Sequence, residues 1–273
     1  MADIAAHSGL SYFLYQEAFD KTPSAEKIQE LLEEHPEITH VSMVHSETTS
    51  GILNDIAAAA KAVKEAGRIF IVDAMSSFGG VDIPVEELGI DYIISSANKC
   101  IQGVPGFSFI ICSREELKKC EGQARSLSLD LYDQWKTMEK DGKWRFTSPT
   151  HVVLAFSQAL KEMEEEGGIP ARHARYAENN RILIEKMEEL GIRPYIEGPL
   201  QGPIITTFYY PEHAEFSFQE MYQYIKERGY AIYPGKVTDA DTFRIGNIGE
   251  IYPEDMEKLA QIIRDFLNEK KEA

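Results

Sequence analysis

The sequence predicts an α/β fold with a mainly parallel sheet, followed by a smaller α+β unit. Through residues 38–112, short apolar runs alternate with longer helical patterns, which is typical of strand–helix–strand units. The run at residues 68–72 is nearly all apolar, as expected for a strand that is covered on both faces. The pattern changes after Gly167 and Gly168, so we predict a large domain at residues 1–168 and a small domain at residues 169–273.

The expected elements of the first domain follow from local signals. Ser24 is suited to cap a helix at its N-terminus, and Gly67 is suited to end one. We expect helices or helical turns at residues 1–7, 25–34, 54–66, 85–88, 114–120, 127–140 and 152–166. We expect strands at residues 11–15, 38–44, 68–72, 91–95 and 107–112.

The second domain begins with a helix that Pro170 is expected to start and Gly191 to end. Its further predicted elements are strands at residues 204–210, 230–233 and 242–245 and helices at residues 218–228 and 253–270.

Composition restricts the classes of function. Lys and Arg number 28 and Asp and Glu number 45, for a net charge of −17, which argues against nucleic acid or an anionic membrane as a partner. The 3 cysteines form no CxxC pair, so we expect no disulfide framework and no metal site. The first residues lack the features of a signal peptide, and we expect a cytoplasmic protein.

Polar residues follow three successive predicted strands where each strand ends. They are residues 46–49 (SETT), Asp73 and Lys99. The carboxyl ends of parallel strands share one edge of a sheet, and sites in α/β folds form at that edge. We therefore expect these side chains to converge on one crevice.

Lys99 is open to several interpretations on its position alone. A lysine at a strand end can be a surface charge, a phosphate clamp or a nucleophile that forms a Schiff base. Asp73 lies 26 residues earlier (99 − 73), about one βαβ crossover, and could simply cap the next turn. Alternatively, a carboxylate can keep a pyridine nitrogen protonated, which is the electron-sink logic of pyridoxal phosphate chemistry. Spacing does not decide between these readings.

Longer stretches carry a resemblance to a known family. They read HSETTSGILN at 45–54, DAMSSFGG at 73–80, SSANKCIQGVPG at 95–106, SLSLDL at 126–131, RFTSPTH at 145–151 and FRIGNIG at 243–249. Together they resemble the 2-aminoethylphosphonate–pyruvate transaminases, which are class V, fold type I pyridoxal-phosphate enzymes. The resemblance runs along essentially the whole chain, and the stretches at 95–106 and 126–131 are specific to this family within class V.

The resemblance implies roles for residues around pyridoxal 5'-phosphate. Lys99 matches the lysine that holds the cofactor covalently and moves the proton between substrate and cofactor. Asp73 matches the partner of the pyridinium nitrogen. Glu47 and Thr48 match the loop that lines the ring, with Thr48 reaching the ring hydroxyl. Thr147 matches a residue that contacts a cofactor phosphate in the neighbouring subunit, so the resemblance implies a homodimer with a shared site.

Arg244 matches the arginine that binds the acidic end of the substrate. A planar guanidinium can pair with a carboxylate or a phosphonate, although an arginine at a strand edge can also be a surface charge. The implied reaction takes the amino group of 2-aminoethylphosphonate, releases phosphonoacetaldehyde, and passes the amino group to pyruvate to form L-alanine.

The chain departs from this family at its start. Family members carry an N-terminal segment with a Gly-rich loop that cradles the cofactor phosphate and an aromatic residue that stacks on the ring. From the sequence we therefore expect an N-terminally truncated transaminase with a bare sheet edge and an uncovered apolar face. Two alternatives stay open, a weak or inactive remnant and a non-enzymatic dimerisation partner of a full-length paralogue.

The residues around Lys99 disfavour two related chemistries of the same class. An alanine–glyoxylate or serine–pyruvate transaminase is disfavoured by the CIQGVPG run at residues 100–106. Cys100 lies beside Lys99, but desulfurases of this class carry their cysteine on a distant loop. We therefore interpret Cys100 as a packing residue.

Overall fold

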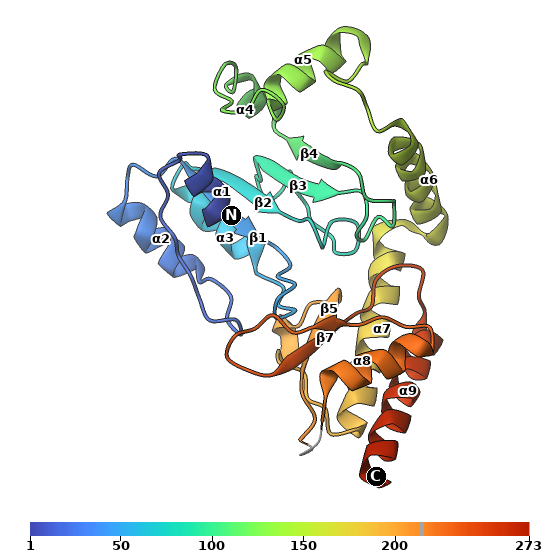
Figure 1. The fold of residues 1–273 in the computed structure, drawn as a ribbon. Coiled ribbons are helices and arrows are strands. Elements are labelled where there is room, and N and C mark those ends of the chain that lie inside the picture. Colours follow the sequence, from blue (N-terminus) through green and yellow to red (C-terminus); the bar gives the residue numbers. More distant parts are fainter. Residues whose placement is uncertain (213–215, 273) are drawn as a thin grey trace.

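Two sheets organise the protein, and a computed structural model describes residues 1–212 and 216–272 (Figure 1). The first sheet has the strand order β1-β2-β3-β4. Its strands are β1 (His40–Val44), β2 (Ile69–Asp73), β3 (Tyr92–Ser96) and β4 (Ser108–Cys112). The first three strands are parallel and β4 is antiparallel to β3. The predicted α/β fold with a mainly parallel sheet is confirmed.

Helices α2 (Ala25–Glu34) and α3 (Ile56–Glu65) pack on this sheet. Ser24 caps α2 as predicted, because its Oγ accepts a hydrogen bond from the backbone N–H of Lys27 at 3.2 Å. The apolar stripe of α2, including Ile28 and Leu32, joins the alanine-rich face of α3 and the buried residues of β2 in one core. A short helix, α1 (Ala2–His7), has no buried residue.

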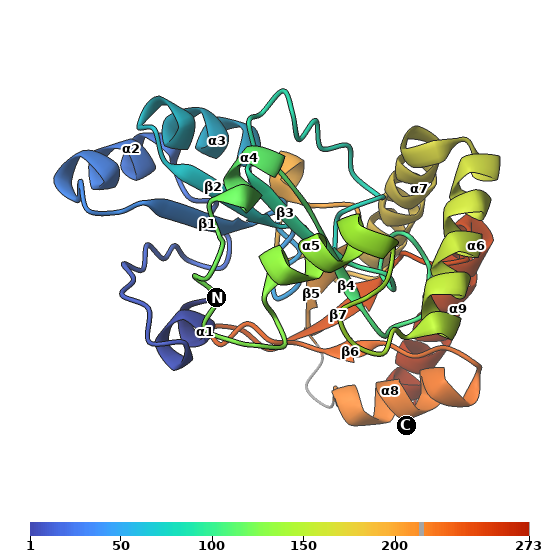
Figure 2. The same cartoon turned by 90° about the horizontal axis from the view of Figure 1, so that it is seen from above.

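A long helical connection joins the two sheets. It comprises α4 (Arg114–Lys118), α5 (Leu131–Asp141), α6 (Thr150–Glu166) and α7 (Gly168–Glu189). Gly167 separates α6 from α7 in a left-handed conformation, with φ of 111°. Figures 1 and 2 both place α2 and α3 at one side of the first sheet and α6 and α7 at the other.

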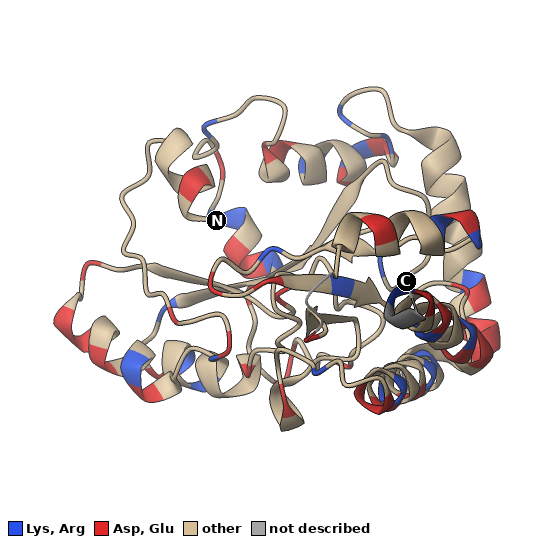
Figure 3. Cartoon of the chain, turned by 60° about the horizontal axis from the view of Figure 1, so that its bottom comes forward, with Lys and Arg blue, Asp and Glu red and all other residues tan. Residues whose placement is uncertain are grey.

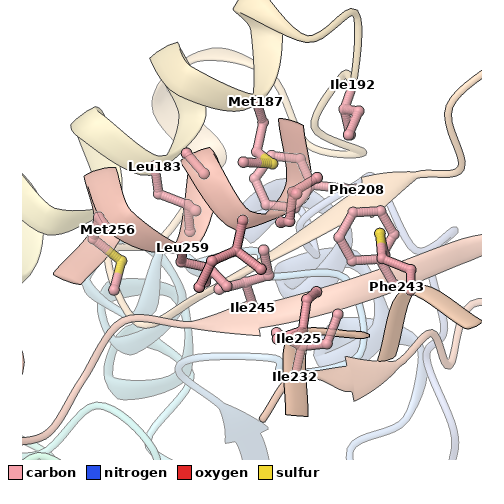
Figure 4. Packing of buried hydrophobic residues seen from close by; sticks show 14 of the residues in the cluster. Leu183, Met187, Ile192, Phe208, Ile225, Ile232, Phe243, Ile245, Met256 and Leu259 are labelled. Atoms are coloured by element: carbon pink, nitrogen blue, oxygen red, sulfur yellow. The ribbon is translucent and has the colours of Figure 1, made fainter. Parts of the chain in front are cut away.

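The second sheet has the strand order β5-β7-β6 and is antiparallel. Its elements are β5 (Ile205–Tyr209), β6 (Tyr233–Pro234) and β7 (Thr242–Gly246), with helices α8 (Phe218–Glu227) and α9 (Pro253–Glu272) and a 3-10 turn at Gly198–Leu200. Buried residues of α7, α8, α9 and the strands form its core, as Figure 4 shows for Leu183, Phe208 and Phe243. This second core supports our division at residue 168, which remains a proposal.

Two predicted strands are wrong. Residues 11–15 form no strand, and Tyr12, Phe13 and Leu14 are exposed, so this β-prone run has no neighbouring strand to pair with. The strand expected at residues 230–233 is reduced to Tyr233–Pro234. These two residues pair with Arg244 and Phe243 of β7, and residues 230–232 lie outside that pairing.

Large apolar side chains are exposed on the first sheet and the connection after it. Ile110 and Ile111 on β4 are exposed, and Leu129, before α5, is 82% exposed. Phe146 and Leu154 extend this exposed set to α6. Sets of this kind mark surfaces that bury themselves against a partner.

Charged residues lie mainly on the outward helices, where acidic and basic positions alternate (Figure 3). Many form pairs three or four residues apart, such as Arg181 with Glu178 and Glu185. In the part of the chain that the structure describes, no helix has the length and apolar character needed to cross a bilayer.

Candidate active site

The loops after β1, β2 and β3 meet at one edge of the first sheet. Val44 lies opposite Asp73, and Asp73 lies opposite Ile94, so the three strand ends are aligned. The backbone N–H of His45 donates to the Asp73 carbonyl at 2.8 Å, and the N–H of Ala74 donates to the Ile94 carbonyl at 2.9 Å. The ends of β1, β2 and β3 therefore lie next to one another at one edge of the sheet, and the convergence of the side chains that follow them stays a prediction.

The loop that carries Lys99 is closed tightly on itself. The N–H of Gly103 donates to the Ala97 carbonyl at 2.8 Å, and a Cβ at Gly103 would lie 2.6 Å from that carbonyl oxygen. Gln102 is the one non-glycine residue in the described ranges with a positive φ, 64°. Such backbone conformations are strained and concentrate at functional sites.

The Lys99 side chain is half-buried at this edge. Within residues 1–212 and 216–272, its Nζ takes part in no hydrogen bond or ion pair to the protein. An amine held in place by its loop and not engaged by a protein carboxylate is available to an incoming group.

Cys100 packs between this loop and the loop after β2. It is 0% exposed, its Sγ donates to the Ser76 carbonyl at 3.1 Å, and a Cβ at Gly80 would lie 2.6 Å from that sulfur. Burial raises the pKa of the Cys100 thiol to about 12, so it stays protonated near neutral pH. These observations support the packing role.

Asp73 ends β2 at the centre of this edge. Its Oδ1 accepts a hydrogen bond from the backbone N–H of Met75 at 3.0 Å, as an aspartate that caps a turn does. In the described part of the chain, its Oδ2 has no hydrogen-bond partner. Asp73 therefore caps the turn through Oδ1, and its Oδ2 can accept a hydrogen bond from another donor.

His45 is a buried member of the same edge that the sequence analysis did not single out. Its Nδ1 lies 2.9 Å from the hydroxyl of Ser77, and burial lowers the pKa of the imidazole to about 4. His45 is therefore neutral at pH 7. Its position at the start of the polar run at 45–51 was the available signal.

This burial predicts a pH dependence of stability. The folded-state pKa of His45 lies below its unfolded value, so the unfolded state binds the proton first. The contribution to the free energy of unfolding is present above about pH 6.5 and is lost as pH falls toward 4. Between pH 7 and pH 5 we expect His45 to account for a loss of about 2 kcal/mol. Urea unfolding of the parent and of His45→Asn at both pH values measures this loss, and an equal loss in both proteins would contradict it.

The loop after β1 brings Glu47 and Thr48 to the site. Glu47 Oε1 accepts the N–H of Thr49 at 2.9 Å, and the N–H of Gly51 closes the turn on the Glu47 carbonyl at 2.9 Å. The Thr48 side chain is half-buried. Ser50 contributes a buried hydroxyl with no hydrogen-bond partner in the described residues.

Arg244 reaches the same loop from the second sheet. It is 6% exposed on β7, its Nε donates to the Pro234 carbonyl at 2.9 Å, and its Nη1 donates to the Thr48 carbonyl at 2.8 Å. Burial lowers the pKa of the guanidinium below its ordinary value, and Tyr233 and Glu47 oppose that shift. Arg244 is therefore not the surface charge that the sequence left open.

Thr147 stands apart from this group. It is exposed on the loop between α5 and α6. Among the described residues, no hydrogen bond joins it to any other predicted site residue. Arg145, two residues earlier, fixes the loop by donating to the Leu127 carbonyl at 2.7 Å.

The polar groups at this edge match what the aldehyde and the ring of pyridoxal phosphate require. The half-buried amine of Lys99, the unengaged Oδ2 of Asp73 and the buried hydroxyl of Ser96, which has no partner in the described ranges, border one edge of the sheet. An amine for the aldehyde and a carboxylate for the ring nitrogen are what this cofactor requires.

Comparison with known proteins decides the family. A family profile described as aminotransferase class-V matches residues 2–243. The chain belongs to the class V aminotransferases. Structurally, this aminotransferase is similar to an aspartate aminotransferase from Thermus thermophilus, with a TM-score of 0.83 and 25% identity over 98% of this chain and 74% of that one. It is also similar to an alanine–glyoxylate aminotransferase from Nostoc sp., with a TM-score of 0.86 and 22% identity over 97% and 71% of the two chains. The fold is that of the fold type I pyridoxal-phosphate aminotransferases.

Curated relatives of this class V aminotransferase are more similar in sequence. A 2-aminoethylphosphonate–pyruvate transaminase from Lysinibacillus sphaericus is 57% identical over 258 residues, 94% of this chain and 70% of the relative. One from Bacteroides fragilis is 55% identical over 268 residues, 97% and 73% of the two chains. A bifunctional phosphonoacetaldehyde hydrolase/aminoethylphosphonate transaminase from Clostridioides difficile is 59% identical over 88% of this chain and 38% of the relative.

Proposed function

We propose that the protein is a 2-aminoethylphosphonate–pyruvate transaminase that uses pyridoxal 5'-phosphate. The observation that carries the proposal is that the buried Arg244 donates to the Thr48 carbonyl in the loop after β1, while Asp73 ends the neighbouring strand β2 and Lys99 follows β3. The relatives that carry this name are 55–57% identical to the chain, which supports the substrate assignment.

When bound, the cofactor supplies a protonated pyridine ring that withdraws electrons from the carbon bearing the amine. Asp73 keeps the ring nitrogen protonated through its free carboxylate oxygen. Thr48 and Glu47 would line the ring of the bound cofactor, and Thr48 would reach its ring hydroxyl. These roles are supported by the backbone, because Asp73 ends β2 and Glu47 and Thr48 follow the neighbouring strand β1.

Lys99 holds the cofactor and moves the proton. Its Nζ takes the proton from the amine-bearing carbon of 2-aminoethylphosphonate, and later delivers a proton to the corresponding carbon of the group that leaves as L-alanine. The closed loop at residues 97–103 fixes the backbone of Lys99. The amine therefore needs only side-chain rotation to act in both half-reactions, with 2-aminoethylphosphonate and with pyruvate.

Arg244 orients both substrates through their acidic ends. Its Nε and Nη1 are fixed by backbone carbonyls, which leaves Nη2 free of protein partners in the described residues. A guanidinium held in this way can pair with the phosphonate of the donor and with the carboxylate of pyruvate. We therefore expect a cationic substrate site within a protein of net charge −17.

We also propose that the active form is a homodimer in which Thr147 contacts the cofactor phosphate of the partner subunit. The exposed position of Thr147, beside exposed Phe146 and near Leu154, supports this assignment. Sedimentation at increasing protein concentration tests the dimer, and a monomer at all concentrations would contradict it.

The substrate assignment is tested by product analysis. The chain with pyridoxal phosphate, 2-aminoethylphosphonate and pyruvate is expected to form phosphonoacetaldehyde and L-alanine in equal amounts. L-Serine as donor and glyoxylate as acceptor are tested in parallel. Faster turnover with that second pair would contradict the assignment while leaving the transaminase class intact.

Arg244→Lys is expected to lower kcat/KM for 2-aminoethylphosphonate by about 10- to 100-fold. Lysine keeps the charge but loses the planar fork that pairs with an acidic group. Arg193→Lys is the matched control, because Arg193 is exposed and lies over the Tyr209 ring. Steady-state kinetics with thermal unfolding curves checks this, and equal kcat/KM in both variants would remove Arg244 from the substrate site.

A further inference from the structure

A hydrogen-bonded cluster on α7 lies between the loop that carries Lys99 and the loop that follows β7. We propose that Tyr176 on this helix is a positioning residue that couples acid binding at Arg244 to the placement of Lys99. The inference rests on the proposed function, because it gives Lys99 and Arg244 their roles. It adds a residue that the motifs around them did not point to.

The hydroxyl of Tyr176 is bonded to both loops. It donates to the Cys100 carbonyl at 3.4 Å and accepts from Gln102 Nε2 at 2.7 Å. Cys100 and Gln102 lie on the same loop as Lys99. The same oxygen accepts the backbone N–H of Gly249 at 3.3 Å. Tyr176 is 0% exposed, so water does not compete for these bonds. A single atom thus joins segments that are more than 140 residues apart (249 − 102 = 147).

The contact at Gln102 bears on the shape of the lysine loop. Gln102 has the left-handed φ of 64°, a conformation that a non-glycine residue keeps only when its surroundings hold it. Its side chain is anchored on Tyr176, and its N–H donates to the Lys99 carbonyl at 2.8 Å. Without this hydrogen bond Gln102 can leave its left-handed conformation, and the turn that carries Lys99 then changes its shape.

Two arginines of the same helix also hydrogen-bond the lysine loop and the loop after β7. Arg172 is 2% exposed, and its Nη1 donates to the carbonyls of Cys100 and Ile101 at 2.9 and 3.3 Å. Arg175 Nη1 donates to the carbonyls of Gly249 and Ile251 at 2.7 and 3.0 Å. Both guanidiniums share the carboxylate of Glu166, with N–O distances of 2.7 and 2.8 Å.

The second loop continues directly from the strand of Arg244. Asn247 follows β7, is fully buried, and donates to the carbonyls of Tyr176 and Pro203 at 3.0 and 2.6 Å. A displacement of β7 when an acid binds at Arg244 is therefore transmitted through Asn247 and Gly249 to Tyr176. Since Tyr176 also holds Cys100 and Gln102, the lysine loop moves with it.

The test uses Tyr176→Phe, which removes only the shared oxygen. Tyr224→Phe is the matched control, because its hydroxyl bonds Glu269 on the far helices and touches neither loop. In the chain without ligand, hydrogen exchange of residues 97–103 and of residues 247–251 is expected to rise about 2- to 10-fold in Tyr176→Phe and to stay unchanged in Tyr224→Phe.

Coupling is measured with phosphonoacetate, which carries a phosphonate but lacks the reacting amine. In the cofactor-loaded parent and in Tyr224→Phe, phosphonoacetate is expected to slow exchange of residues 97–103. In Tyr176→Phe it should still slow exchange around Arg244 but no longer at residues 97–103. With substrates, kcat is expected to fall about tenfold while KM changes less than about twofold. A role of Tyr176 in stability alone would leave the effect of phosphonoacetate on residues 97–103 intact.

The outcomes separate the two proposals. An inactive parent with no bound cofactor would overturn the proposed function. If the parent is active, and phosphonoacetate slows exchange of residues 97–103 equally in the parent and in Tyr176→Phe, only the coupling proposal is overturned. Absence of any response at residues 97–103 in the active parent would overturn it too.

Discussion

Lys99→Ala is expected to lose transamination by at least about 10³-fold and to lose the visible absorption of lysine-bound pyridoxal. The substitution removes the group that holds the cofactor and the group that moves the proton, and proton transfer alone contributes about 10²–10⁴-fold in enzymes. Lys99 belongs to a loop closed by Gly103 and follows β3, the strand next to the one that Asp73 ends. Absorption spectra and initial rates measure both losses.

Two further variants separate the possible roles of this lysine. Lys99→Arg keeps the charge but cannot take part in the covalent chemistry, so a surface charge or a phosphate clamp would tolerate it better than a Schiff-base lysine. Lys161→Ala controls for the loss of a lysine, since Lys161 is exposed on α6. Substantial activity in Lys99→Arg would refute the covalent role, whereas activity only in Lys161→Ala supports it.

Asp73→Asn is expected to lower kcat by about 10²–10³-fold, the usual cost of removing one aligned electrostatic group from an active site. Asparagine retains an oxygen that can accept the Met75 N–H, so the turn after β2 is kept. What is lost is the negative charge that favours the protonated ring nitrogen. The substitution therefore separates the structural role of Asp73 from its electrostatic one.

Asp82→Asn is the control for this prediction, because Asp82 is exposed and lies after the loop at residues 73–80. Thermal unfolding checks that both variants fold. If Asp73→Asn retained the kcat of the parent, Asp73 would be a turn residue only, and the ring nitrogen would need another partner.

The sequence was informative where local pattern and site coincide. Apolar strands that end in polar loops predicted the parallel sheet and the neighbouring strand ends after which the polar loops follow. The burial of Arg244 could not be derived from its neighbours, because it depends on Thr48, which lies 196 residues earlier. Such long-range contacts leave no periodic signal in the chain.

The predictions that were wrong or missed also depend on contacts between distant parts of the chain. Residues 11–15 have the composition of a strand, but strand formation needs a partner that local propensity does not supply. A lone histidine or tyrosine gives no sign in the sequence of which distant groups it contacts, so neither His45 nor Tyr176 was predicted as a site residue. Their importance follows only from hydrogen bonds to Ser77 and to Cys100, Gln102 and Gly249.

The most direct measurement is a visible-absorbance titration of the purified chain with pyridoxal phosphate, followed by 2-aminoethylphosphonate and then pyruvate. We expect a saturable band of lysine-bound pyridoxal that disappears with the amine donor and returns with pyruvate. The band should be absent in Lys99→Ala. No band in the parent, or the same spectrum in the parent and in Lys99→Ala, would contradict the assignment of this chain as a transaminase.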